Sequence, residues 1–224
     1  MPRRFISRTP QRLTASAIAL AAIGLVGLPA TSQSAAPKCP IIVDPEGDAT
    51  APPLISNGLN FLFPNQDAYD IVSADLAADR KLINIVIRVK QLALKAPSSP
   101  TGIFWRFDFT GGQDQHLFTE VVSDSNDTIG QKSGVRAYIG YVDGTAHLIS
   151  YVKPLMDFKH NEVHVRIALS DFGDKAPAAG TKLTALEASG GRWYDTAVFT
   201  LGEPDDTATT EATYVVGRST CIRA

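Results

Sequence analysis

The sequence predicts an all-β fold, an antiparallel jelly-roll-like β-sandwich of about nine or ten strands that follows a signal peptide. Many short segments alternate apolar and polar residues, which is the period of a strand that buries one face. Turn residues separate these segments, and one turn is the Asp143-Gly144 pair, a strong hairpin signal. Together these patterns favour two layered sheets around one core.

The first residues have the pattern of a secretory signal peptide. Four arginines and no acid lie in residues 1–12, an apolar run follows at 13–28, and small or polar residues continue to 36. The apolar run is shorter than the roughly 20 residues of a membrane-spanning helix, so a retained anchor is the weaker alternative. We therefore expect cleavage between residues 30 and 36 and a secreted, extracellular protein with residues 37–224 as a single domain.

The charge balance limits the partners. The chain has 21 basic and 23 acidic side chains, and without the four leader arginines the basic count falls to 17, which leaves a net charge near −6. A mildly acidic surface disfavours nucleic acid and anionic lipid as partners, because both attract basic surfaces. The sequence does not indicate an oligomeric state.

The two cysteines of the chain are Cys39 and Cys221. In an exported protein such a pair is most simply a disulfide, which here would join the two ends of the domain. Free thiols or a shared metal ion are the alternatives. A zinc site is disfavoured because the chain has no CxxC spacing and no histidine beside either cysteine.

The most specific local motif is the acidic turn Asp44-Pro-Glu46-Gly-Asp48, which follows a short apolar strand. Proline and glycine favour a turn, and the turn brings three carboxylates together. Ca²⁺ takes roughly six to eight oxygen ligands, so the turn is a candidate calcium site, and Asp67 and Asp70 are candidates to complete it. The alternative is a turn in which aspartates cap their own backbone.

Beyond this turn, residues 51–64 carry many apolar side chains and no strand pattern, so we expect a long irregular loop that packs over an open end of the sandwich. A central hairpin follows. Val72, Ala74 and Leu76 are expected on its buried face with Ile71 on the other, and residues 83–89 alternate again. The polar residues 79–81 form the turn between the two strands.

This order of features resembles a group of secreted β-sandwich domains. A cysteine, a short strand, Asp-Pro-x-Gly-Asp, a long loop and a hairpin that ends Ile87-Arg88-Val89 are similar to domains related to family 9 carbohydrate-binding modules, DOMON domains and the C-terminal module of glucodextranases. The C-terminal segment Tyr214-Val-Val-Gly-Arg-Ser-Thr-Cys221 resembles that of small secreted proteins of high-GC Gram-positive bacteria. The resemblance implies a jelly-roll-like sandwich and a ligand-binding role.

The remaining alternating segments complete the predicted sandwich. They are residues 103–109, 116–122, 135–141, 147–152, 163–169, 183–188, 196–201 and 213–216. Trp105 lies on an apolar strand face, so it is expected in the core rather than on a sugar-binding surface.

Two further groups of residues are candidate sites. Arg192, Trp193, Tyr194 and Asp195 lie together in a predicted loop, where the aromatic rings could stack on a sugar and the charged groups could bind its hydroxyls. The alternative is that this loop closes one end of the sandwich. The residues His160, Glu162 and His164 alternate along a predicted strand, where they form either a transition-metal site or simply a solvated polar face.

No recognisable catalytic motif is present. The sequence has no Gly-x-Ser-x-Gly elbow, no P-loop and no glycine-rich dinucleotide turn, and we assign no catalytic residue. The favoured function is a secreted, non-catalytic binding module for carbohydrate or a cell-surface polymer, with a structural Ca²⁺. Because a glycosidase needs only two carboxyl groups, a glycan-active or accessory enzyme is the alternative, and a structural envelope protein without a small ligand is a third.

Overall fold

The computed structural model describes residues 41–49, 51–56, 59–63, 66–95, 102–124, 134–192 and 203–217. Backbone contacts divide the chain into two units, Met1–Ala35 and Ala36–Ala224, and all described residues belong to the second. The predicted signal peptide, the Cys39–Cys221 disulfide, residues 193–195 and the predicted strand 196–201 lie outside the described residues and stay predictions.

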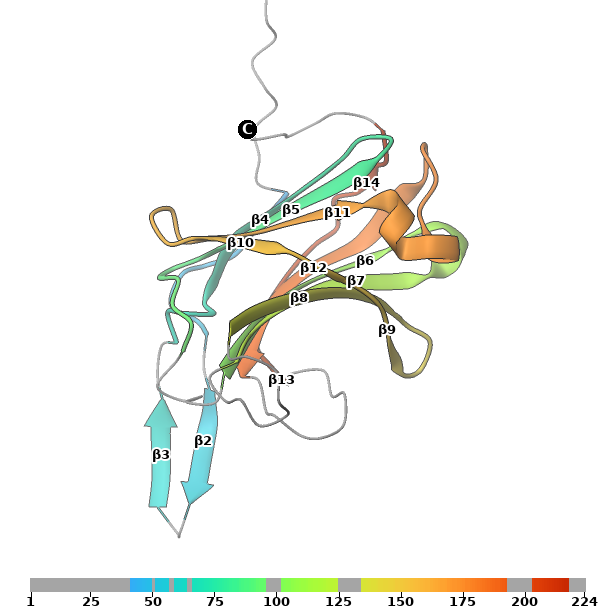
Figure 1. Ribbon diagram of the computed structural model, residues 1–224. Coiled ribbons are helices and arrows are strands. Elements are labelled where there is room, and N and C mark those ends of the chain that lie inside the picture. Colours follow the sequence, from blue (N-terminus) through green and yellow to red (C-terminus); the bar gives the residue numbers. More distant parts are fainter. Residues whose placement is uncertain are drawn as a thin grey trace, which may run out of the picture. The chain divides into compact units, whose positions relative to one another are not determined.

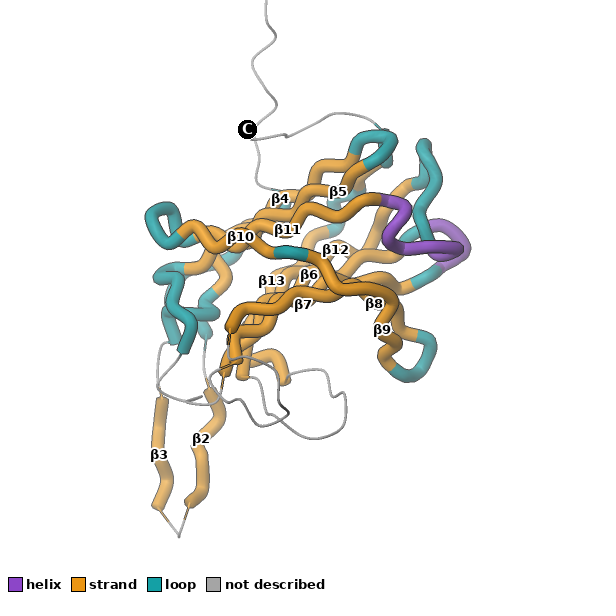
Figure 2. The backbone as a smooth tube through the Cα atoms, in the orientation of Figure 1, coloured by secondary structure: helices purple, strands orange, loops and turns teal. Residues whose placement is uncertain are grey.

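The second unit is an antiparallel β-sandwich of two layers, which confirms the predicted fold class (Figure 1, Figure 2). The five-stranded sheet has the order β1 (Ile42–Val43), β4 (Ile71–Ala78), β5 (Leu82–Val89), β11 (Glu162–Ala168) and β10 (Pro154–Asp157). The seven-stranded sheet has the order β13 (Glu203–Thr210), β12 (Lys182–Arg192), β6 (Gly102–Thr110), β7 (His116–Asp124), β8 (Gly134–Val142) and β9 (Ala146–Val152), and β14 (Tyr214–Val215) also pairs with β12.

Short 3₁₀ segments connect some of the strands. They are η1 (Gly112–Asp114), between β6 and β7, and η2 (Leu169–Lys175), between β11 and β12. Within the part of the chain that the structure describes, no helix is both long enough and apolar enough to span a bilayer.

The expectation of an irregular loop over residues 51–64 is wrong, because β2 (Ala51–Ser56) and β3 (Leu59–Phe63) pair as a separate two-stranded sheet. The first strand contains two adjacent prolines, and proline argues against a strand in a sequence because it has no N–H to donate to the neighbouring strand. The register of this pair shifts between Ala51 and Leu54, at the two prolines. With β10 and β13, which also lack a clear sequence pattern, the described residues hold fourteen strands rather than nine or ten.

The central hairpin of β4 and β5 forms as predicted, with one change of face. Ile71 is fully buried in the core, whereas Val72 is only half-buried. The cause is a register shift between Ile71 and Ser73 against β5, which reverses the expected alternation at the start of β4. The predicted polar turn is present, and Asp79 Oδ1 accepts hydrogen bonds from the backbone N–H groups of Lys81, at 2.6 Å, and Leu82, at 2.8 Å.

The core lies between the two sheets. Trp105, Phe107 and Phe109 of β6 have no exposed surface and belong to one buried cluster with Ile83 and Ile85 of β5. The indole Nε1 of Trp105 donates a hydrogen bond to the carbonyl oxygen of Ala68 at 2.9 Å. Trp105 is therefore a core residue, as the sequence predicts.

Gly190 on β12 allows a close approach between this strand and the segment that leads into β4. A Cβ atom at this position would lie 2.5 Å from the carbonyl oxygen of Tyr69. We expect Gly190→Ala to lower the free energy of unfolding by about 2–3 kcal/mol in urea titrations, because the backbone must move to admit the methyl group. The control is Gly112→Ala, where the nearest atom would be 3.6 Å away. An equal loss in both variants would contradict the steric cause.

Candidate functional site

Four aspartates from three segments of the chain meet where the two sheets approach each other at one edge. Asp44 and Asp48 lie in the turn after β1, Asp70 precedes β4, and Asp206 lies on β13, which contacts β1. One carboxylate oxygen from each of Asp44, Asp48 and Asp206 lies within 4.8 Å of the others. Two ligands of one Ca²⁺, each at about 2.4 Å, are at most about 4.8 Å apart, so this spacing suits a shared ion.

Backbone hydrogen bonds position two of these carboxylates. The N–H of Gly47 donates to Asp70 Oδ2 at 2.7 Å, and the N–H of Ile71 donates to Asp206 Oδ2 at 2.5 Å. Gly47 has a φ of 91°, a conformation that favours glycine, and it lets the acidic turn fold back over Asp70. The bond from Ile71 joins β4 of one sheet to β13 of the other, so the acidic cluster links the two layers.

Two oxygens of the cluster are buried without a hydrogen-bond partner among the described residues. They are Asp44 Oδ2 and Asp70 Oδ1, and Asp70 has no exposed surface at all. A buried carboxylate oxygen without a hydrogen-bond donor is costly, because it has lost its water and gained no partner in exchange. A bound cation would supply the missing partner for both atoms.

The electrostatics of the cluster favour a cation as well. Burial raises the pKa of Asp44, and the charges of Asp48 and Asp70 raise it further, whereas a side-chain hydrogen bond with Asp206 opposes the rise. Burial also raises the pKa of Asp70, although the hydrogen bond from Gly47 opposes this. The pKa of Asp206 is raised to about 7 by burial, with added repulsion from Asp44, Asp48 and Asp70. A divalent cation would replace this repulsion with attraction.

The structure thus brings together three of the five residues predicted for a calcium site, Asp44, Asp48 and Asp70. Of the other two, Glu46 is exposed, and Asp67 Oδ1 lies 2.8 Å from Lys90 Nζ in an ion pair. Asp206 was missed. It follows Pro204 and Asp205, and this sequence is typical of a polar turn rather than a strand. Asp206 reaches the cluster only because β13 packs beside β1, a segment far away in the sequence.

Arg192 is the one predicted ligand-binding residue that lies among the described residues. It is 2 % exposed, and its Nε and Nη2 lie 2.8 Å and 3.0 Å from the carboxylate oxygens of Asp205. This pair joins the end of β12 to the start of β13, on either side of the connection that contains residues 193–195. Arg192 therefore anchors the base of that connection, and a direct contact with a ligand stays a prediction.

A second polar network lies on the outer face of the seven-stranded sheet. The strand register places Arg106, Glu120 and Tyr138 side by side on β6, β7 and β8. Arg106 binds Asp108 through Nε at 2.6 Å and Nη2 at 2.5 Å, and its guanidinium lies 4.2 Å from the centre of the Phe118 ring. The hydroxyl of Tyr138 donates to Glu120 Oε1.

Glu120 is the most deeply buried member of this network. It has no exposed surface, and its Oε2 has no hydrogen-bond partner among the described residues, although Arg106 Nη1 lies 3.8 Å away. Burial raises the pKa of Glu120 to about 7, while the Tyr138 hydrogen bond and the Arg106 charge oppose the rise. Strand alternation in the sequence assigns Glu120 and its neighbours to the outer face and gives no sign that this face is buried.

Comparison with known proteins finds no match, since no family model, no curated protein and no solved structure matches the chain. The assignment of the acidic cluster therefore depends on its geometry and chemistry alone.

Proposed function

We propose that the protein is an extracellular, non-catalytic binding module in which the acidic cluster of Asp44, Asp48, Asp70 and Asp206 holds a structural Ca²⁺. One observation carries the proposal. The cluster draws carboxylates from both sheets and leaves two buried oxygens without a hydrogen-bond partner among the described residues. Oxygen-only ligands of this kind suit a hard cation such as Ca²⁺.

The cation would also fix the base of the predicted ligand-binding loop. Asp206 lies on β13. In the strand register, Arg192 at the end of β12 lies opposite Glu203 at the start of β13, so these two residues flank the connection that contains residues 193–195. A cation that ties β13 to β1 and β4 would hold the start of β13 in place beside the end of β12, and a preorganised base lowers the entropy lost when a ligand binds. The ligand class that we propose is carbohydrate or a cell-surface polymer, as the resemblance of the sequence implies.

A glycan array and a calcium titration test this function together. We expect saturable glycan binding that EGTA weakens, and we expect Trp193→Ala to lower the affinity by about tenfold, since it removes one stacked ring. Tyr151→Ala is the matched control, because Tyr151 is an aromatic residue on β9 with 64 % of its surface exposed. Unchanged binding in Trp193→Ala would exclude the proposed surface, and a Tm that does not change over the calcium titration would exclude the cation.

A glycan-active enzyme is the second candidate. Glu120 and Asp108 flank Arg106, and a glycosidase uses two carboxyl groups of this kind. The complete burial of Glu120 favours the binding module, because a substrate could reach this carboxyl group only if the site opened. Hydrolysis products that disappear in Glu120→Gln would establish the enzyme instead.

A further inference from the structure

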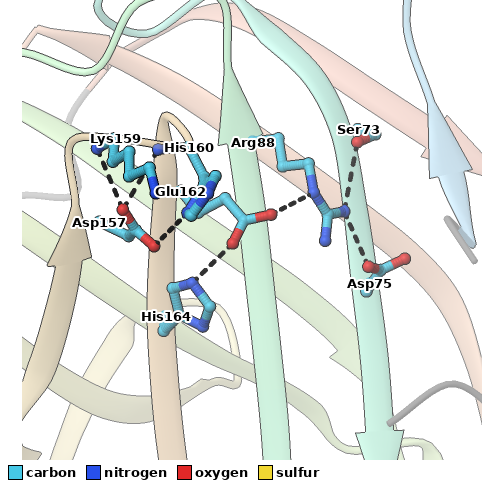
Figure 3. Close-up of polar contacts among 8 residues, drawn as sticks. All are labelled: Ser73, Asp75, Arg88, Asp157, Lys159, His160, Glu162 and His164. Carbon is cyan, nitrogen blue, oxygen red and sulfur yellow. Dashed lines mark hydrogen bonds and ion pairs between the residues drawn. The ribbon is translucent and has the colours of Figure 1, made fainter. Parts of the chain in front are cut away.

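A cluster of histidines and carboxylates lies on the outer face of the five-stranded sheet (Figure 3). In the register of β10 and β11, Asp157 lies opposite Glu162, and His164 is two residues further along β11 on the same face. One ligand atom from each of these three residues lies within 4.8 Å of the others. His160, in the turn between the two strands rather than on a strand, places its Nδ1 2.7 Å from Asp157 Oδ2.

The ligand types differ from those of the calcium cluster. Imidazole nitrogen with carboxylate oxygen is a donor set for zinc and related transition metals, whereas calcium takes oxygen alone. The short contacts within the cluster join a histidine to a carboxylate, at 2.7 Å between His160 and Asp157 and at 2.9 Å between His164 Nε2 and Glu162 Oε2. A proton must lie in each contact, and a metal ion can take its place.

Neighbouring groups hold the two carboxylates in position. Glu162 Oε1 accepts a hydrogen bond from Arg88 Nε at 2.6 Å, and Arg88 Nη1 lies 2.7 Å from Asp75 Oδ2, so the other oxygen of Glu162 is left facing His164 (Figure 3). Asp157 Oδ1 accepts the backbone N–H groups of Lys159, at 3.0 Å, and His160, at 3.2 Å. Such outer contacts orient ligands before a metal binds.

The cluster is open to solvent on one side. His164 also lines a hollow of about 490 Å³ on the same face, together with Asn84, Lys153 and Arg166. The side chains of His164 and Asp157 are 33 % and 31 % exposed, so a hydrated metal ion can reach both.

We propose that Asp157, Glu162 and His164 form a site for a divalent metal of the zinc class beside this hollow, with water as the fourth ligand. His160, which contacts Asp157 Oδ2, helps to orient that carboxylate. The site is separate from the calcium cluster in position and in ligand type. It requires neither calcium nor a glycan.

Isothermal titration of the full chain with ZnCl₂, in buffer that contains calcium, tests the proposal. We expect one equivalent of Zn²⁺ to bind with release of protons, and Co²⁺ to give the visible absorption of a tetrahedral site. His164→Gln is expected to lower the zinc affinity by at least about 30-fold, and Asp157→Asn should have an effect of similar size from the opposite strand. Circular dichroism checks that both variants fold.

Two control variants distinguish zinc binding at this cluster from zinc binding elsewhere on the chain. His147→Gln removes a histidine that also contacts an aspartate, since His147 Nε2 lies 2.6 Å from Asp143 Oδ1. Among the described residues, His147 belongs to no cluster of three possible metal ligands. This variant should therefore leave zinc binding unchanged. Asp70→Asn should weaken calcium binding and leave zinc binding unchanged. The proposal is overturned if the full chain binds no zinc, if both His164→Gln and Asp157→Asn bind it normally, or if His147→Gln abolishes binding.

Discussion

Asp206→Asn is expected to stabilise the calcium-free protein and to destabilise the protein in calcium. Without calcium, the variant removes one of four crowded carboxylates, and the amide oxygen still accepts the hydrogen bond from the N–H of Ile71. We expect a gain of about 1–2 kcal/mol at pH 8, since the raised pKa of Asp206 shows that its charge is costly in the folded state.

In calcium the sign reverses, because the variant loses a charged ligand. At a calcium concentration of about 100 times the Kd, the wild-type protein gains about 2.7 kcal/mol, which corresponds to a Tm higher by roughly 5–10 °C. The variant should gain much less. Thermal unfolding of both proteins in EGTA and in calcium measures the crossover.

The matched control for this experiment is Asp174→Asn, which changes a carboxylate whose side chain is 87 % exposed. It should follow the wild-type protein in both conditions. A calcium-induced rise in Tm that is equal in Asp206→Asn and the wild-type protein would mean that the acidic cluster does not hold the ion.

The sequence predicts those parts of the structure that depend on local order. Alternation over residues 83–89 and 103–109 corresponds to β5 and β6, since both strands bury one complete apolar row. The acidic turn is visible for the same reason, because proline, glycine and three acids are adjacent. These features require no knowledge of what lies across the sheet.

The parts that were missed depend on contacts between distant segments. Asp206 joins Asp44 and Asp48 only because β13 lies at the edge of its sheet beside β1, and its segment has a weak strand pattern. Likewise, Asp157 reaches Glu162 through the register of β10, a short strand that begins with a proline. The burial of Arg106 and Glu120 on an outer face has no sequence signature either, because polar residues on alternate positions ordinarily face water.

Glu120 is expected to make the protein less stable as the pH rises from 5 to 8. Its pKa is 4.5 in an exposed setting and about 7 in the folded protein, so the folded state binds the proton more tightly. Stability from this group is therefore complete below about pH 4.5, falls as the pH rises and is lost above about pH 7. The loss between pH 5 and pH 8 is about 2.5 kcal/mol.

Urea unfolding of Glu120→Gln and the wild-type protein at several pH values isolates this effect. The variant keeps an oxygen that accepts the hydrogen bond from Tyr138 and cannot ionise, so its stability relative to the wild-type protein should rise by about 2.5 kcal/mol from pH 5 to pH 8. Both proteins keep the charged and titratable groups around this carboxyl, which are Arg106, Asp108 and Tyr138. Subtracting the stability of one protein from that of the other at each pH therefore cancels the contributions of the other titrating groups. Glu211→Gln, at an exposed position, should show no such divergence. Parallel curves for Glu120→Gln and the wild-type protein would show that Glu120 is ionised in the folded state throughout this range, with Arg106 as its counterion.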